Sequence, residues 1–172
     1  EICGFQAVNK LTNIRRVQIV ACGTSYHAGL IARHWLETEV KLPCQVDIAS
    51  EFRYRTILVE PDTLFVTLSQ SGETADTLEA LRVAKTKNYA ATLTICNVPE
   101  STMVRESDFV LLTRAGPEIG VASTKAFVSQ VAVMALLALF LGRQRDLSLG
   151  VGRKIAEELN ALPDKMRTVL SR

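Results

Sequence analysis

One polar turn near the middle of the chain decides the fold: Thr67-Leu68-Ser69-Gln70-Ser71-Gly72-Glu73-Thr74-Ala75-Asp76-Thr77. The apolar run 64–66 leads into it, and apolar residues at helical spacing lead out of it. This pattern predicts the point where a buried strand passes into a helix. We expect Ser71 to cap that helix with Glu73 in its first turn, and Gly72 to let the backbone approach a ligand closely.

The composition of this turn indicates an anion site. Residues 69–74 hold three hydroxyl side chains and one amide beside the expected helix N-terminus. Such a terminus offers unpaired N–H groups and a partial positive charge, which suit a phosphate. An ordinary capped helix is the alternative, and the crowding of small donors favours the anion site over it.

A second hydroxyl-rich turn, Cys22-Gly23-Thr24-Ser25, follows the apolar run 17–21. It is not a dinucleotide fingerprint, because only Gly23 and Gly29 are present, and it lacks the Gly-Lys-Ser/Thr of a P-loop. Neither turn contains Lys or Arg, so we expect modest affinity for a metabolite monophosphate rather than a nucleotide.

Apolar runs alternate with helical patterns along the whole chain. We expect strands at 17–21, 44–48, 63–68, 91–96 and 109–112, and helices at 24–39, from the first turn to about 88, at 124–141 and at 150–172. Residues 50–55 are expected to form a short helix or loop, 101–106 one helical turn, and Pro163 to kink or break the last helix. The alternation predicts a three-layer α/β/α fold with a five-stranded parallel sheet. Ligands of such sheets bind beyond the carboxyl ends of the strands.

Composition narrows the functional classes. The 172 residues suffice for one domain, and 48% hydrophobic with 22% charged residues is typical of a globular protein. The net charge of +2 gives no sign of a nucleic-acid partner. Four cysteines without a C-x-x-C pair and two histidines predict no metal site and no cofactor, in a reduced, cytoplasmic protein. The longest apolar run, 131–141, is shorter than the roughly 20 residues of a membrane span, so we expect a buried core helix.

Five blocks of this sequence together resemble a known family. These blocks are 21–25, 48–55, 69–77, 95–99 and 118–126, and they resemble the first SIS (sugar isomerase) domain of the isomerising glutamine–fructose-6-phosphate aminotransferases. The resemblance covers nearly the whole chain. It implies a flavodoxin-like strand order, in which the first and third strands are neighbours. It also implies a substrate site in which Ser69, Gln70, Ser71 and Thr74 hold a phosphate, while Thr24, Ser25, Val121 and Ser123 match sugar-contacting positions. Cys22 and Gly23 are expected to belong to the same substrate-binding site.

The resemblance also implies a function. We expect the chain to bind fructose 6-phosphate or glucosamine 6-phosphate as the first half of an isomerase module. The whole reaction, part of hexosamine biosynthesis, converts fructose 6-phosphate and glutamine into glucosamine 6-phosphate and glutamate. In the family the catalytic base, the lysines and a histidine of the neighbouring subunit come from a second SIS domain. We therefore expect no catalytic residue in this chain.

The implied organisation is that of an excised domain. We expect a linker at 1–16, the SIS domain at 17–148, and a helix at 149–172 that leads to a second SIS domain outside this sequence. The expected partners are that domain and a glutaminase domain of the same chain, in a homodimer, with no nucleic acid and no membrane.

Two other functions stay open at this point. One is a regulatory SIS domain that senses a phosphosugar without catalysis. The other is a stand-alone phosphosugar isomerase, which would need its acid and base among Glu51, Glu73 and His27.

Three local features also bear on the site. Ser123 is either an N-cap or a ligand contact, Lys125 suggests an acidic or phosphate neighbour, and the run 51–55 is either a solvated face or an interface.

Overall fold

The core of the molecule is a five-stranded parallel sheet with the strand order β2-β1-β3-β4-β5. The structure is a computed structural model, and it describes residues 10–120 and 123–171. The strands run in one direction, so their carboxyl ends meet at one edge. This confirms the expected α/β fold and its flavodoxin-like order. The strands are β1 (Arg16–Ala21), β2 (Cys44–Ile48), β3 (Thr63–Ser69), β4 (Ala91–Cys96) and β5 (Phe109–Leu112).

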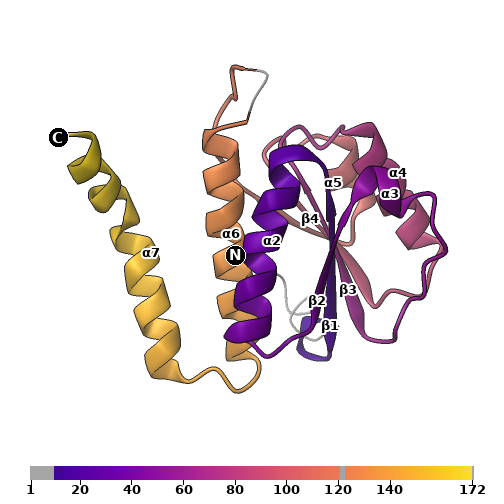
Figure 1. Ribbon diagram of the computed structural model, residues 1–172, viewed down its shortest axis with the longest axis horizontal. Coiled ribbons are helices and arrows are strands. Elements are labelled where there is room, and N and C mark those ends of the chain that lie inside the picture. Colours follow the sequence, from indigo (N-terminus) through magenta and orange to yellow (C-terminus); the bar gives the residue numbers. More distant parts are fainter. Residues whose placement is uncertain (1–9, 121–122, 172) are drawn as a thin grey trace.

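Helices cover both faces of the sheet (Figure 1). One face carries α2 (Gly23–Thr38) and α6 (Lys125–Arg143), and the other carries α3 (Ala49–Phe52), α4 (Ala75–Lys85) and α5 (Thr102–Glu106). The alternation of side chains along a strand assigns them to these layers. Ile19 packs in the core on the α2 and α6 side, whereas Val20 packs with α3 and α4 on the other side.

Helix α6 is the apolar helix that the sequence predicts. It has 19 residues, and an 18-residue window of it has a mean hydropathy of 1.9, so by length and composition alone it could cross a membrane. It lies against α2 and the sheet instead (Figure 1), and Met134 and Leu141 on its inner face are fully buried. The expected buried core helix is therefore present at this position.

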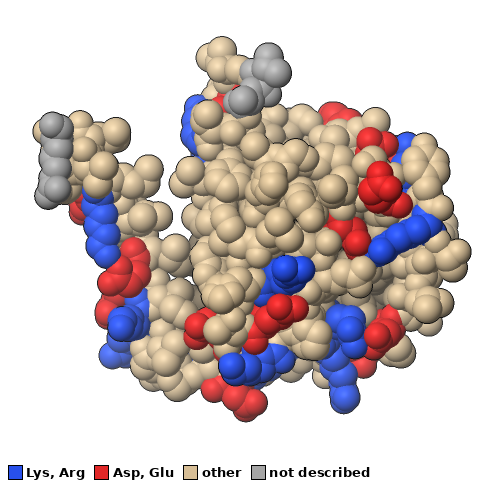
Figure 2. All heavy atoms as spheres, viewed as in Figure 1, with Lys and Arg blue, Asp and Glu red and all other residues tan. Residues whose placement is uncertain are grey.

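Helix α7 (Leu149–Leu170) packs on α6 near its start, where Gly152 faces Arg143 and Leu139, and its later turns stand away from the rest of the molecule (Figure 1). It continues through Pro163, so the expected break does not occur, and Ser148 caps its first turn by accepting a hydrogen bond from Val151 N. Of its described residues only Gly152 is buried. An open, largely apolar groove of about 600 Å³ separates α7 from α2 and α6, and Figure 2 shows this hollow beside the arm.

Candidate functional site

The two hydroxyl-rich turns meet at the carboxyl edge of the sheet. We call residues 22–25 the cysteine turn and residues 69–74 the serine turn. They follow β1 and β3, which are hydrogen-bonded neighbours with Ala21 opposite Leu68. The first turn of α4 also contacts the cysteine turn, because the Thr77 hydroxyl donates to Cys22 Sγ at 3.8 Å. Residues 47 positions apart in the sequence thus share one edge of the fold.

Two helix N-termini are directed at this edge without side-chain caps. Helix α2 begins after Cys22 and α4 begins after Thr74, and neither of these residues makes a capping hydrogen bond with its side chain. The first N–H groups of a helix have no partner within the helix. Together with the helix dipole they leave a donor-rich, electropositive space suited to an anion.

The serine turn is held in shape by its own hydroxyls. Ser69 Oγ accepts a hydrogen bond from Gly72 N at 2.9 Å and lies 3.1 Å from Thr74 Oγ1. Ser71 Oγ accepts from Glu73 N at 3.2 Å. The expectation that Ser71 caps the helix is wrong, since α4 begins only after Thr74. Gly72, at φ +69°, turns the backbone away from helical geometry before the helix can start there.

The glycines of the two turns have different surroundings. A Cβ on Gly72 would lie 2.1 Å from Ser101 Oγ and 2.7 Å from Cys96 Sγ, so the close approach at this glycine is to the neighbouring loop. Gly23 also has a positive φ, of 57°, but a Cβ there would meet no atom within 4 Å. Among the two, Gly23 is the one that borders open space, and Thr24 beside it is exposed.

Asn97 joins the serine turn to the loop that precedes α6. Its backbone N–H donates to Gln70 O at 3.2 Å. Its side chain donates to Gly116 O at 2.7 Å and accepts from Ala115 N at 2.8 Å and from Thr113 Oγ1 at 3.0 Å. No role for Asn97 was predicted from the sequence. A polar residue directly after a buried strand was the available signal.

Glu118 caps helix α6 from within that loop. Ala126 N donates to its Oε2 at 2.8 Å, and Thr124 Oγ1 donates to its Oε1 at 3.0 Å. These bonds, first of all that from Ala126 N–H, lower the pKa of the Glu118 carboxyl, and Lys125 lowers it further. The expected acidic neighbour of Lys125 is therefore Glu118.

Ser123 is not the N-cap of α6, because Thr124 occupies that position. The Ser123 hydroxyl is buried and has no hydrogen-bond partner in the described part of the chain. Val121, the other residue expected to contact a sugar from this loop, lies outside the described residues.

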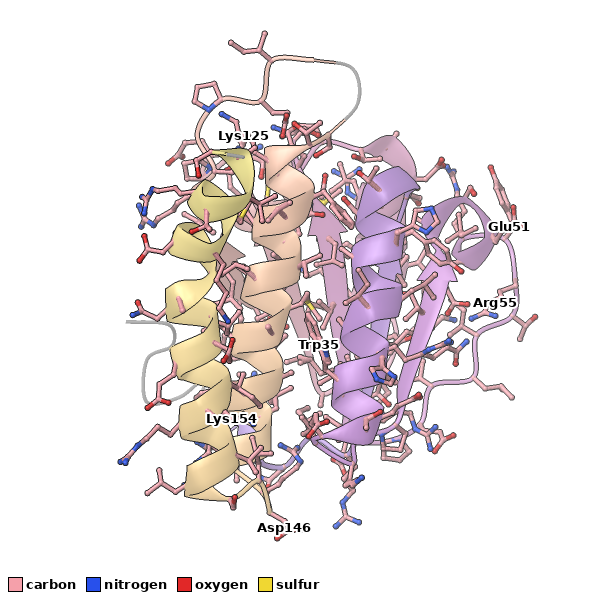
Figure 3. All side chains as sticks on the ribbon, turned by 60° about the vertical axis from the view of Figure 1, so that its left-hand side comes forward. Trp35, Glu51, Arg55, Lys125, Asp146 and Lys154 are labelled. Atoms are coloured by element: carbon pink, nitrogen blue, oxygen red, sulfur yellow. The ribbon has the colours of Figure 1, made fainter. Side chains whose placement is uncertain are left out.

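Several charged side chains around the edge already have partners. Arg53 lies 3.0 Å from Asp76, and Arg55 lies 2.7 Å from Asp47. Glu73 accepts a hydrogen bond from Thr102 N at 2.7 Å, which lowers the pKa of its carboxyl. Figure 3 places Glu51 and Arg55 beside α3, away from Lys125 at the start of α6.

The cysteine turn and the serine turn themselves offer hydroxyl and backbone N–H groups as donors. Within residues 10–120 and 123–171, no group of three or more His, Cys, Asp or Glu side chains could hold a metal ion. Of the residues expected at the site, the structure gathers Cys22–Ser25 and Ser69–Thr74 along two neighbouring strands. Ser123 lies at the start of α6, which begins at the same end of the molecule as α2 (Figure 1).

Comparison with known proteins finds a family that matches most of the chain and relatives that match nearly all of it. The SIS domain family matches residues 10–140. The chain is 58% identical over 169 residues to the isomerising glutamine–fructose-6-phosphate aminotransferase of Pseudomonas syringae pv. tomato, a match that covers 98% of this chain and 28% of that protein. The chain therefore spans little more than a quarter of the length of this relative.

Solved structures agree with the family match. The C-terminal domain of glucosamine–fructose-6-phosphate aminotransferase from Francisella tularensis superposes with a TM-score of 0.87 at 47% identity, over 91% of this chain and 44% of that one. A glucosamine-6-phosphate deaminase from Thermotoga maritima superposes with a TM-score of 0.73 at 26% identity, over 91% and 47%. With its order of strands, its serine turn and a family match over most of its length, the chain belongs to the SIS domain family.

Proposed function

We propose that the chain binds the phosphate group of a hexose 6-phosphate at the carboxyl edge of β1 and β3. The observation that carries this proposal is the meeting of two hydroxyl-rich turns with the N-termini of α2 and α4, neither of which has a side-chain cap. In this proposal the phosphate lies on the serine turn, at Ser69, Gln70, Ser71 and Thr74. The sugar lies against Cys22, Gly23, Thr24, Ser25, Val121 and Ser123.

The charges near the edge support a weakly bound monophosphate. Neither turn contains Lys or Arg, and the nearby Arg53 and Arg55 are paired with Asp76 and Asp47. Binding would rest on neutral hydroxyls and backbone N–H groups, and hydrogen bonds from charged donors are about twice as strong. A triphosphate would bring more charge than these donors can neutralise.

The relatives suggest which hexose phosphate binds. Their names refer to fructose 6-phosphate and glucosamine 6-phosphate. We infer that this chain is the first half of an isomerase module that converts fructose 6-phosphate and glutamine into glucosamine 6-phosphate and glutamate. A second SIS domain and a glutaminase domain would complete that enzyme, as a cytoplasmic homodimer.

Titration calorimetry tests the binding proposal. We expect fructose 6-phosphate and glucosamine 6-phosphate to bind the chain more tightly than ATP or NAD. Ser71→Ala should weaken sugar-phosphate binding by about 1.5–3 kcal/mol, because it removes a hydrogen bond to a charged group. Ser148→Ala is the matched control, since Ser148 also accepts from a backbone N–H but lies at the start of α7. Tighter binding of ATP or NAD, or equal effects of the two variants, would reject the proposal.

A further inference from the structure

One buried polar side chain on α6 has no hydrogen-bond partner among the described residues. Gln130 is 1% exposed, and neither its Nε2 nor its Oε1 makes a hydrogen bond within the described part of the chain. A buried amide that has lost its water without gaining a partner destabilises the state in which it occurs. An apolar side chain of similar size would remove this destabilisation, so the amide at this position needs another explanation.

The one other unpartnered buried side-chain atom among the described residues stands close to Gln130 in the sequence. It is the Ser123 hydroxyl, seven positions before Gln130 on the segment that enters α6. Helical side chains lean back toward the N-terminus, so the Gln130 amide lies over the turn that contains Ala126. That turn is the first of α6, which begins at Lys125 directly after Ser123 and the N-cap Thr124. The Gln130 amide is therefore directed toward the N-terminal end of α6, the end at which Ser123 lies.

Ser123 lies where the loop before α6 joins the helix, and the Gln130 side chain leans toward that end. Asn97 fixes the start of this loop, and Glu118 fixes its end through Ala126 N and Thr124. These anchors leave Ser123 between the Glu118 cap and the first turn of α6. Ser123 belongs to the proposed sugar site. A shift of its hydroxyl on ligand binding would therefore change the hydrogen-bond partners available to Gln130.

We propose that Gln130 is a positioning residue of the sugar-phosphate site, whose carboxamide hydrogen-bonds the Ser123 hydroxyl in the ligand-bound protein and orients it toward the sugar. This inference rests on the proposed function. Gln130 acts through Ser123, because at 1% exposure it does not reach a ligand itself. Its amide is unpaired in the free protein and paired in the bound one, and this difference favours the bound state.

The test replaces the amide by an apolar side chain of similar shape. We expect Gln130→Met to raise the melting temperature of the free protein by about 2–4 °C, since it removes an unpaired buried group. The same change should weaken fructose 6-phosphate binding about tenfold, a difference of about 1.4 kcal/mol. The affinity for inorganic phosphate, which engages the serine turn alone, should not change.

A double-mutant cycle shows whether Gln130 acts through Ser123. If it does, Ser123→Ala combined with Gln130→Met should lose no more affinity for fructose 6-phosphate than Ser123→Ala alone. Met134→Leu is the matched control, because Met134 lies one turn further along the same buried face and carries no hydrogen-bonding group. Both the affinity and the melting temperature of this control should stay close to those of the wild type.

Each other outcome overturns a different statement. Additive losses in the cycle, unchanged fructose 6-phosphate affinity in Gln130→Met, or a lower melting temperature would overturn the role of Gln130. Gln130→Leu serves as a second replacement if the Met variant does not fold. A wild-type chain that binds inorganic phosphate but no sugar phosphate would overturn the proposed function, and this inference with it.

Discussion

At the scale of single residues, the two turn glycines occupy the same edge for different reasons. Both have a positive φ, which costs a residue with a Cβ about 1–2 kcal/mol. Gly72 is also enclosed, because a Cβ there would overlap Ser101 Oγ and Cys96 Sγ. Gly23 is open, with no atom within 4 Å of the same position. Gly72 is therefore required both by the left-handed backbone and by the lack of space for a Cβ, whereas Gly23 is required by the left-handed backbone alone.

This difference predicts the outcome of a pair of matched substitutions. Gly23→Ala should lower the free energy of unfolding by about 1–2 kcal/mol, the cost of the left-handed backbone. Gly72→Ala should cost a further ~1–3 kcal/mol, since the methyl group must displace Ser101 or Cys96. Urea denaturation measures the free energy of unfolding of each variant and so gives both losses. Equal losses in the two variants would contradict this, because they would mean that the loop around Ser101 moves aside for the methyl group without loss of stability.

At the scale of the elements, the helix starts at the functional edge are set by distant residues. The sequence predicts Ser71 as an N-cap from its local position and allows Ser123 the same role, but neither residue caps its helix. The Glu73 carboxylate accepts a hydrogen bond from Thr102 N at the start of α5, and Glu118 caps α6 from the preceding loop. Such contacts depend on how the chain folds back on itself, so local capping rules do not reveal them.

The Glu118 cap predicts a pH dependence of stability. Hydrogen bonds from Ala126 N–H and Thr124 hold the folded-state pKa of this carboxyl below its usual 4.5. A lowered pKa means that the stabilisation is complete above about pH 4.5 and is lost as the pH falls through the folded-state value. Glu118→Gln should therefore be less stable than the wild type at pH 7, and the difference should shrink in acid.

Thermal denaturation at several pH values checks this expectation. Glu157→Gln is a suitable control, because Glu157 is exposed on α7, away from the loop. Its effect on stability should be small at each pH. A Glu118→Gln deficit that stays constant or grows as the pH falls would contradict a charge-assisted cap.

At the scale of the whole molecule, the alternation of strands and helices was sufficient to predict the layers and the parallel sheet. This alternation did not predict the order of the strands, which was expected from the family resemblance alone. The order matters because it makes β1 and β3 neighbours and so brings the two turns together. The role of Asn97 between the serine turn and the later loop also depends on this arrangement, and sequence spacing alone did not indicate it.

The same arrangement engages the carboxylates beside the serine turn and at the start of α6 in other interactions. Isomerisation moves a proton between adjacent carbons, and it needs a base within about 2.6–3.2 Å of its partner, directly or through one water. Glu73 and Glu118 accept hydrogen bonds from backbone N–H groups that lower their pKa, and Asp76 is paired with Arg53. Ser, Thr and Gln side chains in the turns are poor bases near neutral pH.

We therefore expect the 172-residue chain to bind fructose 6-phosphate but not to form glucosamine 6-phosphate from it, even with free ammonia. A product assay checks this, with calorimetry on the same sample as the control for a folded, binding-competent protein. Adding the remaining part of a full-length relative in trans should restore product only if that part supplies the base. Turnover by the chain alone would instead identify it as an isomerase in its own right. Glu51→Gln, Glu73→Gln and His27→Ala would then show which side chain moves the proton.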